Sequence, residues 1–175
     1  MNRAWLEATV RGITSRIRST RLILATVTRH TMSYFYRIAE QKDGQSIYRL
    51  YRLVMHDYVS KIWSWNEQWQ IDDFTANFDH NNIMLVHDNH ELIGYSHVEN
   101  RRTQLYIRMI VIHPEHQQKG IGTKLLKAII MSGKEQSKSI GLQVFKINDK
   151  AKAFYVRHGF TVSGETTSSY TLIHD

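Results

Sequence analysis

The chain of 175 residues contains no cysteine, a single proline and no long apolar run. The absence of cysteine excludes a disulfide framework, a thiolate metal site and a cysteine nucleophile. No apolar stretch approaches the roughly 20 residues that a membrane-spanning helix needs. Hydrophobic residues make up 42% and charged residues 22% of the chain, which is typical of a globular protein and excludes extended disorder. The length suits one well-packed domain better than two.

Basic residues are in excess, with 23 lysines and arginines against 16 acidic residues and a formal charge of +7. Residues 1–31 hold six arginines and one glutamate, so this segment carries +5 and residues 32–175 carry only +2. Three interpretations of segment 1–31 stay open: an upstream extension, a targeting peptide, or an arm for nucleic acid or a membrane surface. Because nucleic-acid binding would rest on this segment alone, we do not expect it of the body.

We expect the working domain to cover residues 32–175. The apolar stretch from Leu22 to Val27 is shorter than the roughly 7–15 residues of a secretory signal core. A cytoplasmic location is therefore expected, with targeting to an organelle by segment 1–31 left open.

Apolar residues in the body follow two periodicities, which predict alternating strands and helices. Helical spacing is found over residues 47–58, 66–78, 120–132 and 148–158. Strand-like segments are expected at residues 33–39, 83–87, 92–98, 105–112, 140–145, 160–162 and 170–173. The order β-α-α-β-β-β-α-β-α-β-β contains no repeat and no second core, and it predicts a single α+β domain.

Local signals predict where several of these elements begin and end. Ser46 and Asn66 are expected to cap the first two helices at their N-termini, and Gly133 to cap the third at its C-terminus. Residues 88–91 are expected to form a hairpin turn. Segment 105–112 is almost entirely apolar, which predicts a central strand that is buried on both faces.

The junction after this long strand carries the clearest functional signal. The strand ends at a proline, and residues 117–123 then form a glycine-containing turn that opens an amphipathic helix. At such a helix start, consecutive backbone N–H groups lack an acceptor and lie at the positive end of the helix dipole. Gly120 and Gly122 lack the Cβ atoms that would hinder a ligand, and Lys119 and Lys124 add positive charge. The junction therefore predicts a phosphate or pyrophosphate site.

Two segments of the body resemble motifs of a known family. The spacing Gln117-x-x-Gly120-x-Gly122, after a strand and a proline, resembles the acetyl-coenzyme A signature [RQ]-x-x-G-x-[GA] of the GNAT superfamily of N-acetyltransferases. Residues 148–160 resemble the family's segment N-x-x-A-x-x-[FL]-Y-x-x-x-G-F. By contrast, the patterns G-x-x-x-x-G-K-[ST] and G-x-G-x-x-G are absent. The resemblance implies a GNAT fold, an α+β acyl-CoA N-acyltransferase fold whose mixed, mostly antiparallel sheet is flanked by helices.

The resemblance also implies an activity and a cosubstrate. Acetyl-CoA would donate its acetyl group directly to a primary amine of a small molecule or peptide, without a covalent enzyme intermediate. The backbone of Ile110, Val111 and Ile112 would hold the pantetheine arm. The pyrophosphate would be held by the N–H groups of Gln117, Gln118, Lys119, Gly120, Ile121, Gly122 and Thr123. Gln117 replaces the commoner arginine, which removes one positive charge beside the pyrophosphate.

Two further residues of the second segment have implied roles, each with an alternative. Tyr155 stands where the family commonly keeps the general acid that protonates the leaving thiolate, and a phenol with a pKa near 10 can supply that proton. The alternative is a tyrosine that only fills the core. Asn148 either binds the coenzyme or caps the helix that follows it.

The general base is less clearly indicated. Glu67 follows two tryptophans, and a carboxylate beside indole rings is expected to have a raised pKa. Its alternative role is that of a first-turn carboxylate stabilised by the helix dipole. Weaker candidates are Glu99, His113 and Tyr106. The tryptophans themselves are expected in the core, with the acceptor site as the alternative place.

No metal is expected, although the chain has ten histidines. His80, His87 and His90 do not form an H-x-x-x-H pair and fall on loops and strand ends. The expected partners are acetyl-CoA and an amine substrate, with a homodimer left open. The alternative function is a catalytically silent sensor or interaction module that binds acyl-CoA on the same fold.

Overall fold

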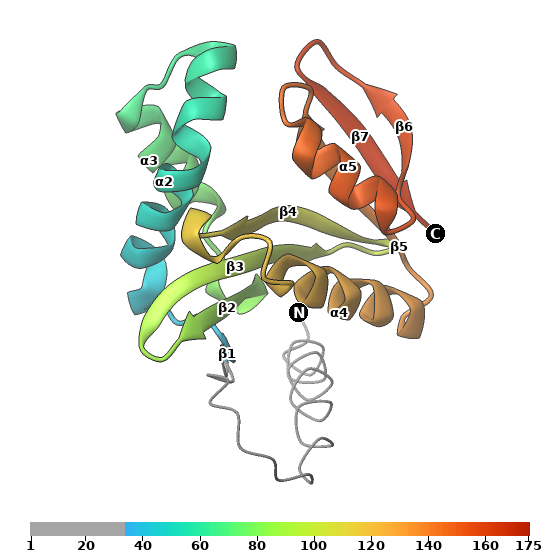
Figure 1. Ribbon diagram of the computed structural model, residues 1–175, viewed down its shortest axis with the longest axis horizontal. Coiled ribbons are helices and arrows are strands. Elements are labelled where there is room, and N and C mark those ends of the chain that lie inside the picture. Colours follow the sequence, from blue (N-terminus) through green and yellow to red (C-terminus); the bar gives the residue numbers. More distant parts are fainter. Residues whose placement is uncertain (1–33) are drawn as a thin grey trace, which may run out of the picture.

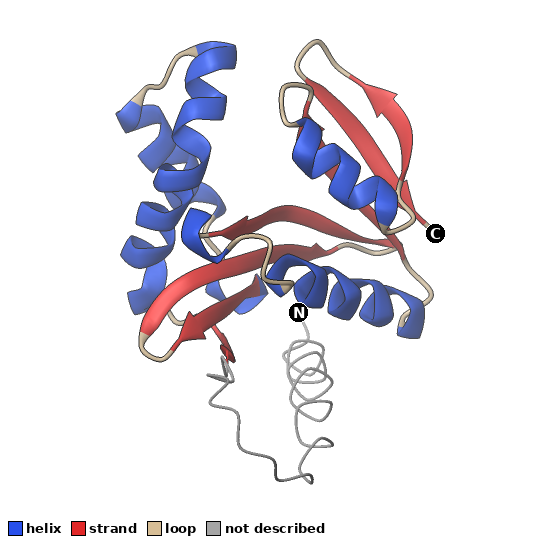
Figure 2. Ribbon diagram, in the orientation of Figure 1, coloured by secondary structure: helices blue, strands red, loops and turns tan. Residues whose placement is uncertain are grey.

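The computed structural model describes residues 34–175, so the segment over residues 1–31 lies outside the described residues. Within this range the chain forms a mixed sheet of seven strands in the order β1-β2-β3-β4-β5-β7-β6 (Figures 1 and 2). The strands are β1 (Tyr34–Ile38), β2 (Ile83–Asp88), β3 (Glu91–Asn100), β4 (Gln104–Ile112), β5 (Ser139–Phe145), β6 (Thr161–Glu165) and β7 (Ser169–His174). Neighbouring strands are antiparallel except β4 and β5, which are parallel. The expected mixed, mostly antiparallel sheet is confirmed.

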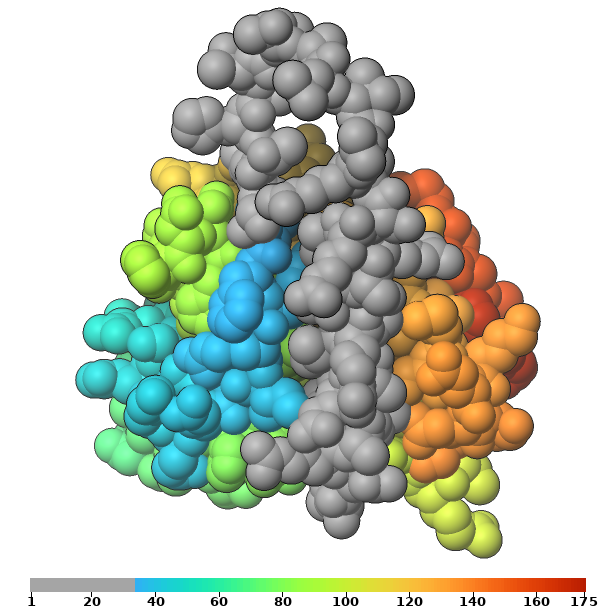
Figure 3. All heavy atoms as spheres, turned by 90° about the horizontal axis from the view of Figure 1, so that it is seen from below, coloured from blue at the N-terminus to red at the C-terminus, as the bar shows by residue number. Residues whose placement is uncertain are grey.

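Four α-helices flank this sheet in the described part of the chain. They are α2 (Gly44–Trp63), α3 (Glu67–Asn77), α4 (Ile121–Glu135) and α5 (Asp149–Arg157). In Figure 1, α2 and α3 stand on one side and α5 with the β6–β7 hairpin on the other, with β4 and β5 between them. From below, α4 (orange) and β1 (blue) reach the same face of the molecule (Figure 3). None of the helices within residues 34–175 is long and apolar enough to cross a membrane.

The core consists of three apolar clusters that follow the helices. Ile47 and Leu50 of α2 pack against Leu85, Tyr95 and Val111 of the sheet. The first turns of α4 pack against β1, β2 and β3. The rest of α4 shares a cluster with β4, β5, β7 and Tyr155 of α5. The helical spacing of the sequence therefore identifies the buried faces of α2 and α4 correctly, but not that of α3, where Ile71 is exposed and the buried residue is Gln70.

Two of the expected helix caps differ from the structure. Ser46 lies inside α2, and the N-cap position is taken by Asp43. The carboxylate of Asp43 accepts hydrogen bonds from Arg37 (2.7 Å to each oxygen) and from the backbone N–H of Glu40 (2.7 Å). The prediction of Ser46 was wrong because these contacts fix the start of the helix earlier. The expected cap at Asn66 is confirmed, since its Oδ1 accepts the Trp69 N–H at 3.0 Å.

Gly133 does not cap α4 but lies inside this helix, which ends at Glu135. A Cβ atom at this position would meet side-chain atoms of Ile140 and the carbonyl oxygen of Lys138 at 3.1 Å. The glycine thus allows close packing of α4 on β5.

The tryptophans and the long strand are less buried than expected. Trp63 and Trp69 are 61% and 58% exposed, so the prediction that the tryptophans lie in the core is wrong for both. Strand β4 is central in the sheet, as predicted, but only Leu105, Ile107 and Val111 of its residues are buried. The incomplete burial of β4 reflects an opening beside this strand.

Candidate active site

The opening begins where β4 and β5 separate. The two strands pair only from Gln104–Ser139 to Ile107–Leu142. Beyond this point β4 continues beside β3, and β5 continues beside β7. One edge of β4 from Arg108 to Ile112 therefore faces no strand, and it includes Ile110, Val111 and Ile112, the residues expected to hold pantetheine.

A β-bulge lies at the point of separation. His97 of β3 pairs with Met109 and Val98 with Ile107, so Arg108 is an extra residue on β4. A bulge bends its strand and increases the local twist. The bulge thus accounts for the departure of β4 from β5 immediately after Ile107.

The loop after β4 presents a row of backbone donors. The N–H of Gln117 donates to the Pro114 carbonyl at 3.2 Å. The next six N–H groups, from Gln118 to Thr123, have no acceptor among residues 34–175. Six consecutive donors at the start of α4 lie at the positive end of its dipole, an arrangement that can hold an anion of pyrophosphate size. The N–H group of Gln117 already has an acceptor, so of the groups expected to hold the pyrophosphate only those from Gln118 to Thr123 are free to do so.

Two positive φ angles shape this loop. Gln118 has φ of 60° and Gly120 has φ of 80°. A Cβ atom at Gly120 would meet nothing within 4 Å, so protein packing does not require a glycine here. The side chain of Gln117 donates from Nε2 to the Ile112 carbonyl at 3.0 Å and so joins the loop to the end of β4.

Tyr155 lies in α5 with its ring in the core. The residue is 8% exposed, and its ring contacts those of Phe154 and Phe160 at centroid distances of 5.2 and 5.5 Å. The hydroxyl has no hydrogen-bond partner among residues 34–175, but its oxygen is not closed off from solvent. Burial raises the pKa of Tyr155 above its ordinary value. The phenol is therefore protonated at neutral pH and available as a donor.

Asn148 caps the helix that carries Tyr155. Its Oδ1 accepts the Ala151 N–H at 3.1 Å. The capping role is thus present, and it leaves the two side-chain N–H donors of this half-buried asparagine available to a ligand.

Glu67 is held in a network between α2 and α3. Its carboxylate accepts hydrogen bonds from Trp65 Nε1 (2.7 Å), Tyr48 Oη (3.0 Å) and Arg52 Nε (3.0 Å). These bonds, that of Trp65 first, lower the pKa of Glu67. The expectation of a raised pKa was wrong because the Trp65 indole donates a hydrogen bond to the carboxylate, whose side chain remains 44% exposed.

The weaker candidates for the base are also engaged with protein groups. Burial acts to raise the pKa of Glu99, but hydrogen bonds from Arg108 and Arg101 outweigh it, and the net shift is downward. Burial raises the pKa of Tyr106, whose ring lies under the Arg101 guanidinium at 3.8 Å. His113 Nδ1 accepts the Glu115 N–H at 3.4 Å.

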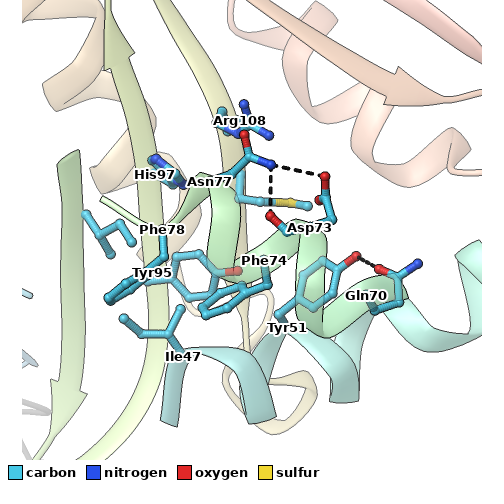
Figure 4. Close-up of a pocket in the computed structure, with 12 residues that line it drawn as sticks. Ile47, Tyr51, Gln70, Asp73, Phe74, Asn77, Phe78, Tyr95, His97 and Arg108 are labelled. Atoms are coloured by element: carbon cyan, nitrogen blue, oxygen red, sulfur yellow. Dashed lines mark hydrogen bonds between the residues drawn. The ribbon is translucent and has the colours of Figure 1, made fainter. Parts of the chain in front are cut away.

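A pocket that the sequence analysis missed lies between α3 and the sheet. It has a volume of about 70 Å³ and is lined by Tyr51, Gln70, Asp73, Asn77, His97, Arg108 and by apolar residues (Figure 4). Burial is the main cause that lowers the pKa of His97 to about 4. The pocket adjoins the opening, because Arg108 belongs to both. No local sequence signal identifies it, since its walls come from residues that lie far apart in the chain.

The histidines of the described part do not gather into a metal site. No group of three or more metal-ligating side chains is found among residues 34–175. His87 packs against the Phe35 ring at 6.3 Å, and His80 lies near the Phe78 ring at 6.4 Å.

The comparison with known families agrees with this geometry. The model of the acetyltransferase (GNAT) family matches residues 46–160, which is more than half of the 175 residues. The chain therefore belongs to the GNAT acetyltransferase family. None of the curated protein sequences compared with the chain is similar to it.

Solved structures similar to the chain include several N-acetyltransferases. The PaiA N-acetyltransferase from Thermoplasma acidophilum, solved with coenzyme A, has a TM-score of 0.68 at 18% identity, over 82% of this chain and 99% of its own. The ribosomal-protein-S18-alanine N-acetyltransferase from Escherichia coli has a TM-score of 0.61 at 18% identity, over 80% of this chain and 91% of its own. Naa50 from Arabidopsis thaliana, solved with the bisubstrate analogue CoA-Ac-MVNAL, has a TM-score of 0.58 at 17% identity, over 82% of this chain and 99% of its own. At these identities the likeness establishes the acyl-CoA N-acyltransferase fold.

Proposed function

We propose that this protein is an N-acetyltransferase that moves the acetyl group of acetyl-CoA directly to a primary amine. One observation carries the proposal: the unpaired edge of β4 leads to a loop with six N–H groups that lack acceptors. An extended pantetheine arm would bond along the edge from Ile110 to Ile112, as a strand would. The pyrophosphate would then accept hydrogen bonds from the loop from Gln118 to Thr123, in addition to the attraction of the α4 dipole.

The proposed reaction is a single displacement. The neutral amine attacks the thioester carbon, a C–N bond forms, and the C–S bond breaks. The sulfur leaves as a thiolate and takes the phenolic proton of Tyr155. The amine loses its extra proton to a base, for which Glu67 is retained as the candidate despite its lowered pKa. The protein supplies no nucleophile, which agrees with the absence of cysteine.

The second candidate is a protein that binds acyl-CoA without transferring the acyl group. It would use the same β4 edge and the same loop, but it would not need a donor at Tyr155. The hydroxyl of Tyr155 has no hydrogen-bond partner among residues 34–175, which favours the enzyme, because a tyrosine that only filled the core would be expected to have its hydroxyl hydrogen-bonded.

The test measures acetyl-CoA turnover against a panel of amines, as release of free thiol, together with equilibrium binding of acetyl-CoA. The panel contains amino acids, aliphatic amines and a peptide that begins with alanine, because one structural relative is named for an alanine of ribosomal protein S18. Tyr155→Phe is expected to lower kcat by about 100-fold, the lower end of general acid catalysis, with acetyl-CoA affinity changed less than twofold. Tyr170→Phe, on neighbouring β7, is the control and should change kcat less than twofold.

Two results would contradict the proposal. An unchanged kcat in Tyr155→Phe would exclude this residue as the general acid. Tight binding of acetyl-CoA without transfer to any amine of the panel would favour the sensor.

A further inference from the structure

The pocket beside the opening contains a charged group in an unusual position. Arg108 is the bulged residue of β4, and it directly follows Ile107, the last residue that pairs with β5. Its side chain lines the pocket together with Met109 and His97 (Figure 4). A cation therefore lies beside the point where β4 and β5 separate, two residues before Ile110, where the proposed pantetheine arm begins.

This guanidinium is only partly engaged by the protein. Arg108 Nη1 donates to Glu99 Oε1 at 2.7 Å. Glu99 also accepts two hydrogen bonds from Arg101, at 2.7 and 3.0 Å, so one carboxylate serves two arginines. Nε and Nη2 of Arg108 have no acceptor among residues 34–175. These two donors form the edge of a guanidinium that binds a carboxylate through two parallel hydrogen bonds.

The opposite wall of the pocket carries the opposite charge. Asp73 of α3 lines the pocket, and its carboxylate accepts a hydrogen bond from Asn77 Nδ2 at 3.0 Å. No ion pair joins Asp73 to Arg108 among the described residues. A molecule that carries both an anionic and a cationic group would complement the two walls.

The floor of the pocket is apolar and small. It is formed by Ile47, Phe74, Phe78, Ile83 and Tyr95. A volume of about 70 Å³ holds roughly five to seven water molecules at 10–15 Å³ each. An aliphatic amino-acid side chain has about this size, whereas a folded protein surface could not enter.

From these contacts we infer that the acceptor is a free α-amino acid with an aliphatic side chain. This inference rests on the proposed function and names the substrate of the same site. The carboxylate of the amino acid binds the Nε–Nη2 edge of Arg108, and its side chain fills the apolar floor. Its amino group, two bonds from the carboxylate carbon, lies between Arg108 and Asp73, beside the separation of β4 and β5. Arg108 is thus a specificity-determining residue.

The experiment compares leucine with leucinol in the full-length protein, with acetyl-CoA turnover read as free thiol. Leucinol keeps the side chain and a primary amine of similar basicity but replaces the carboxylate with a neutral group. The expected ratio of kcat/KM, leucine over leucinol, is at least ten. In Arg108→Gln this ratio should fall to about one. Arg101→Gln is the matched control, because Arg101 bonds to the same Glu99 but does not line the pocket, and it should keep the ratio within twofold.

Binding of leucine and leucinol to the protein saturated with coenzyme A, measured by calorimetry, separates the inference from the proposed function. Equal or better use of leucinol by the unmodified protein would overturn the inference and leave the N-acetyltransferase standing. A preference that survives in Arg108→Gln would also overturn it. If no amine is acetylated, the proposed transfer is refuted. Binding of leucine that depends on Arg108 would still support the inference about the ligand. Equal binding of the two ligands, or none, would refute the inference as well.

Discussion

The row of N–H groups before α4 can be tested by placing a charge inside it. Gly120 is the suitable position, because a Cβ atom there would meet nothing within 4 Å. Its φ of 80° is left-handed, a conformation that asparagine and aspartate adopt more readily than other residues with side chains. Gly120→Asp and Gly120→Asn therefore carry the same steric and backbone cost, about 1 kcal/mol, and differ mainly by one negative charge.

The size of the effect follows from Coulomb's law. A carboxylate at residue 120 lies within about 6 Å of a phosphate held by the neighbouring N–H groups. Two unit charges at this distance repel by about 3 kcal/mol at an effective dielectric constant of 20, and solvent at this exposed loop reduces the value to about 2 kcal/mol. Acetyl-CoA should thus bind roughly 30-fold more weakly to Gly120→Asp than to Gly120→Asn.

The assay is calorimetric titration of both variants with acetyl-CoA at low and high salt. The difference between the variants should shrink as salt increases, since it is electrostatic. Urea unfolding should show equal stability for both variants, so that the difference in affinity cannot come from unfolding. Equal affinity of Gly120→Asp and Gly120→Asn would refute the assignment of the pyrophosphate to this loop.

Three further predictions concern the α2–α3 half. The hydrogen bonds from Arg37 lower the pKa of Asp43 to about 2, so this group stabilises the fold above about pH 4, and its contribution is lost as the pH falls toward 2. Asp43→Asn should therefore lower the unfolding free energy, measured with urea, by about 2 kcal/mol at pH 7 and by little near pH 2. The control is Asp57→Asn at an exposed position, which should have no such effect. Ser64 has φ of 67° and ψ of 143°, a strained conformation for a residue with a side chain, so Ser64→Gly should raise the unfolding free energy by about 0.5–1 kcal/mol, and a loss of stability would disprove the strain. Glu67→Gln should lower the urea midpoint of unfolding, because three donors lose a charged acceptor. If the acid limb of the pH profile of kcat/KM persists in this variant, Glu67 is excluded as the base.

Local patterns in the sequence were sufficient to predict the helices, the strands and the row of unpaired N–H groups before α4. The loop from Gln118 to Thr123 and the position of Tyr155 follow from short motifs, because a helix start and its unpaired N–H groups depend on neighbouring residues only. The cap at Asn66 was found for the same reason.

Features that depend on contacts between distant segments were not predicted. The extra residue Arg108 arises from the register of β4 against β3, which single-strand periodicity does not reveal. The lowered pKa of Glu67 depends on the orientation of the Trp65 indole, and the start of α2 depends on the reach of Arg37 from β1. Each of these outcomes is set by tertiary geometry, which the residue types at a site do not specify.

The short pairing between β4 and β5 has a consequence for the handling of the protein. A continuous sheet has two edge strands, but the separation after Ile107 and Leu142 creates two more unpaired segments in the middle of this one. Unpaired strand edges are templates for association with other chains. A ligand that bonds along β4 covers one of them, so a cosubstrate bound there would also protect the protein from aggregation during concentration and storage.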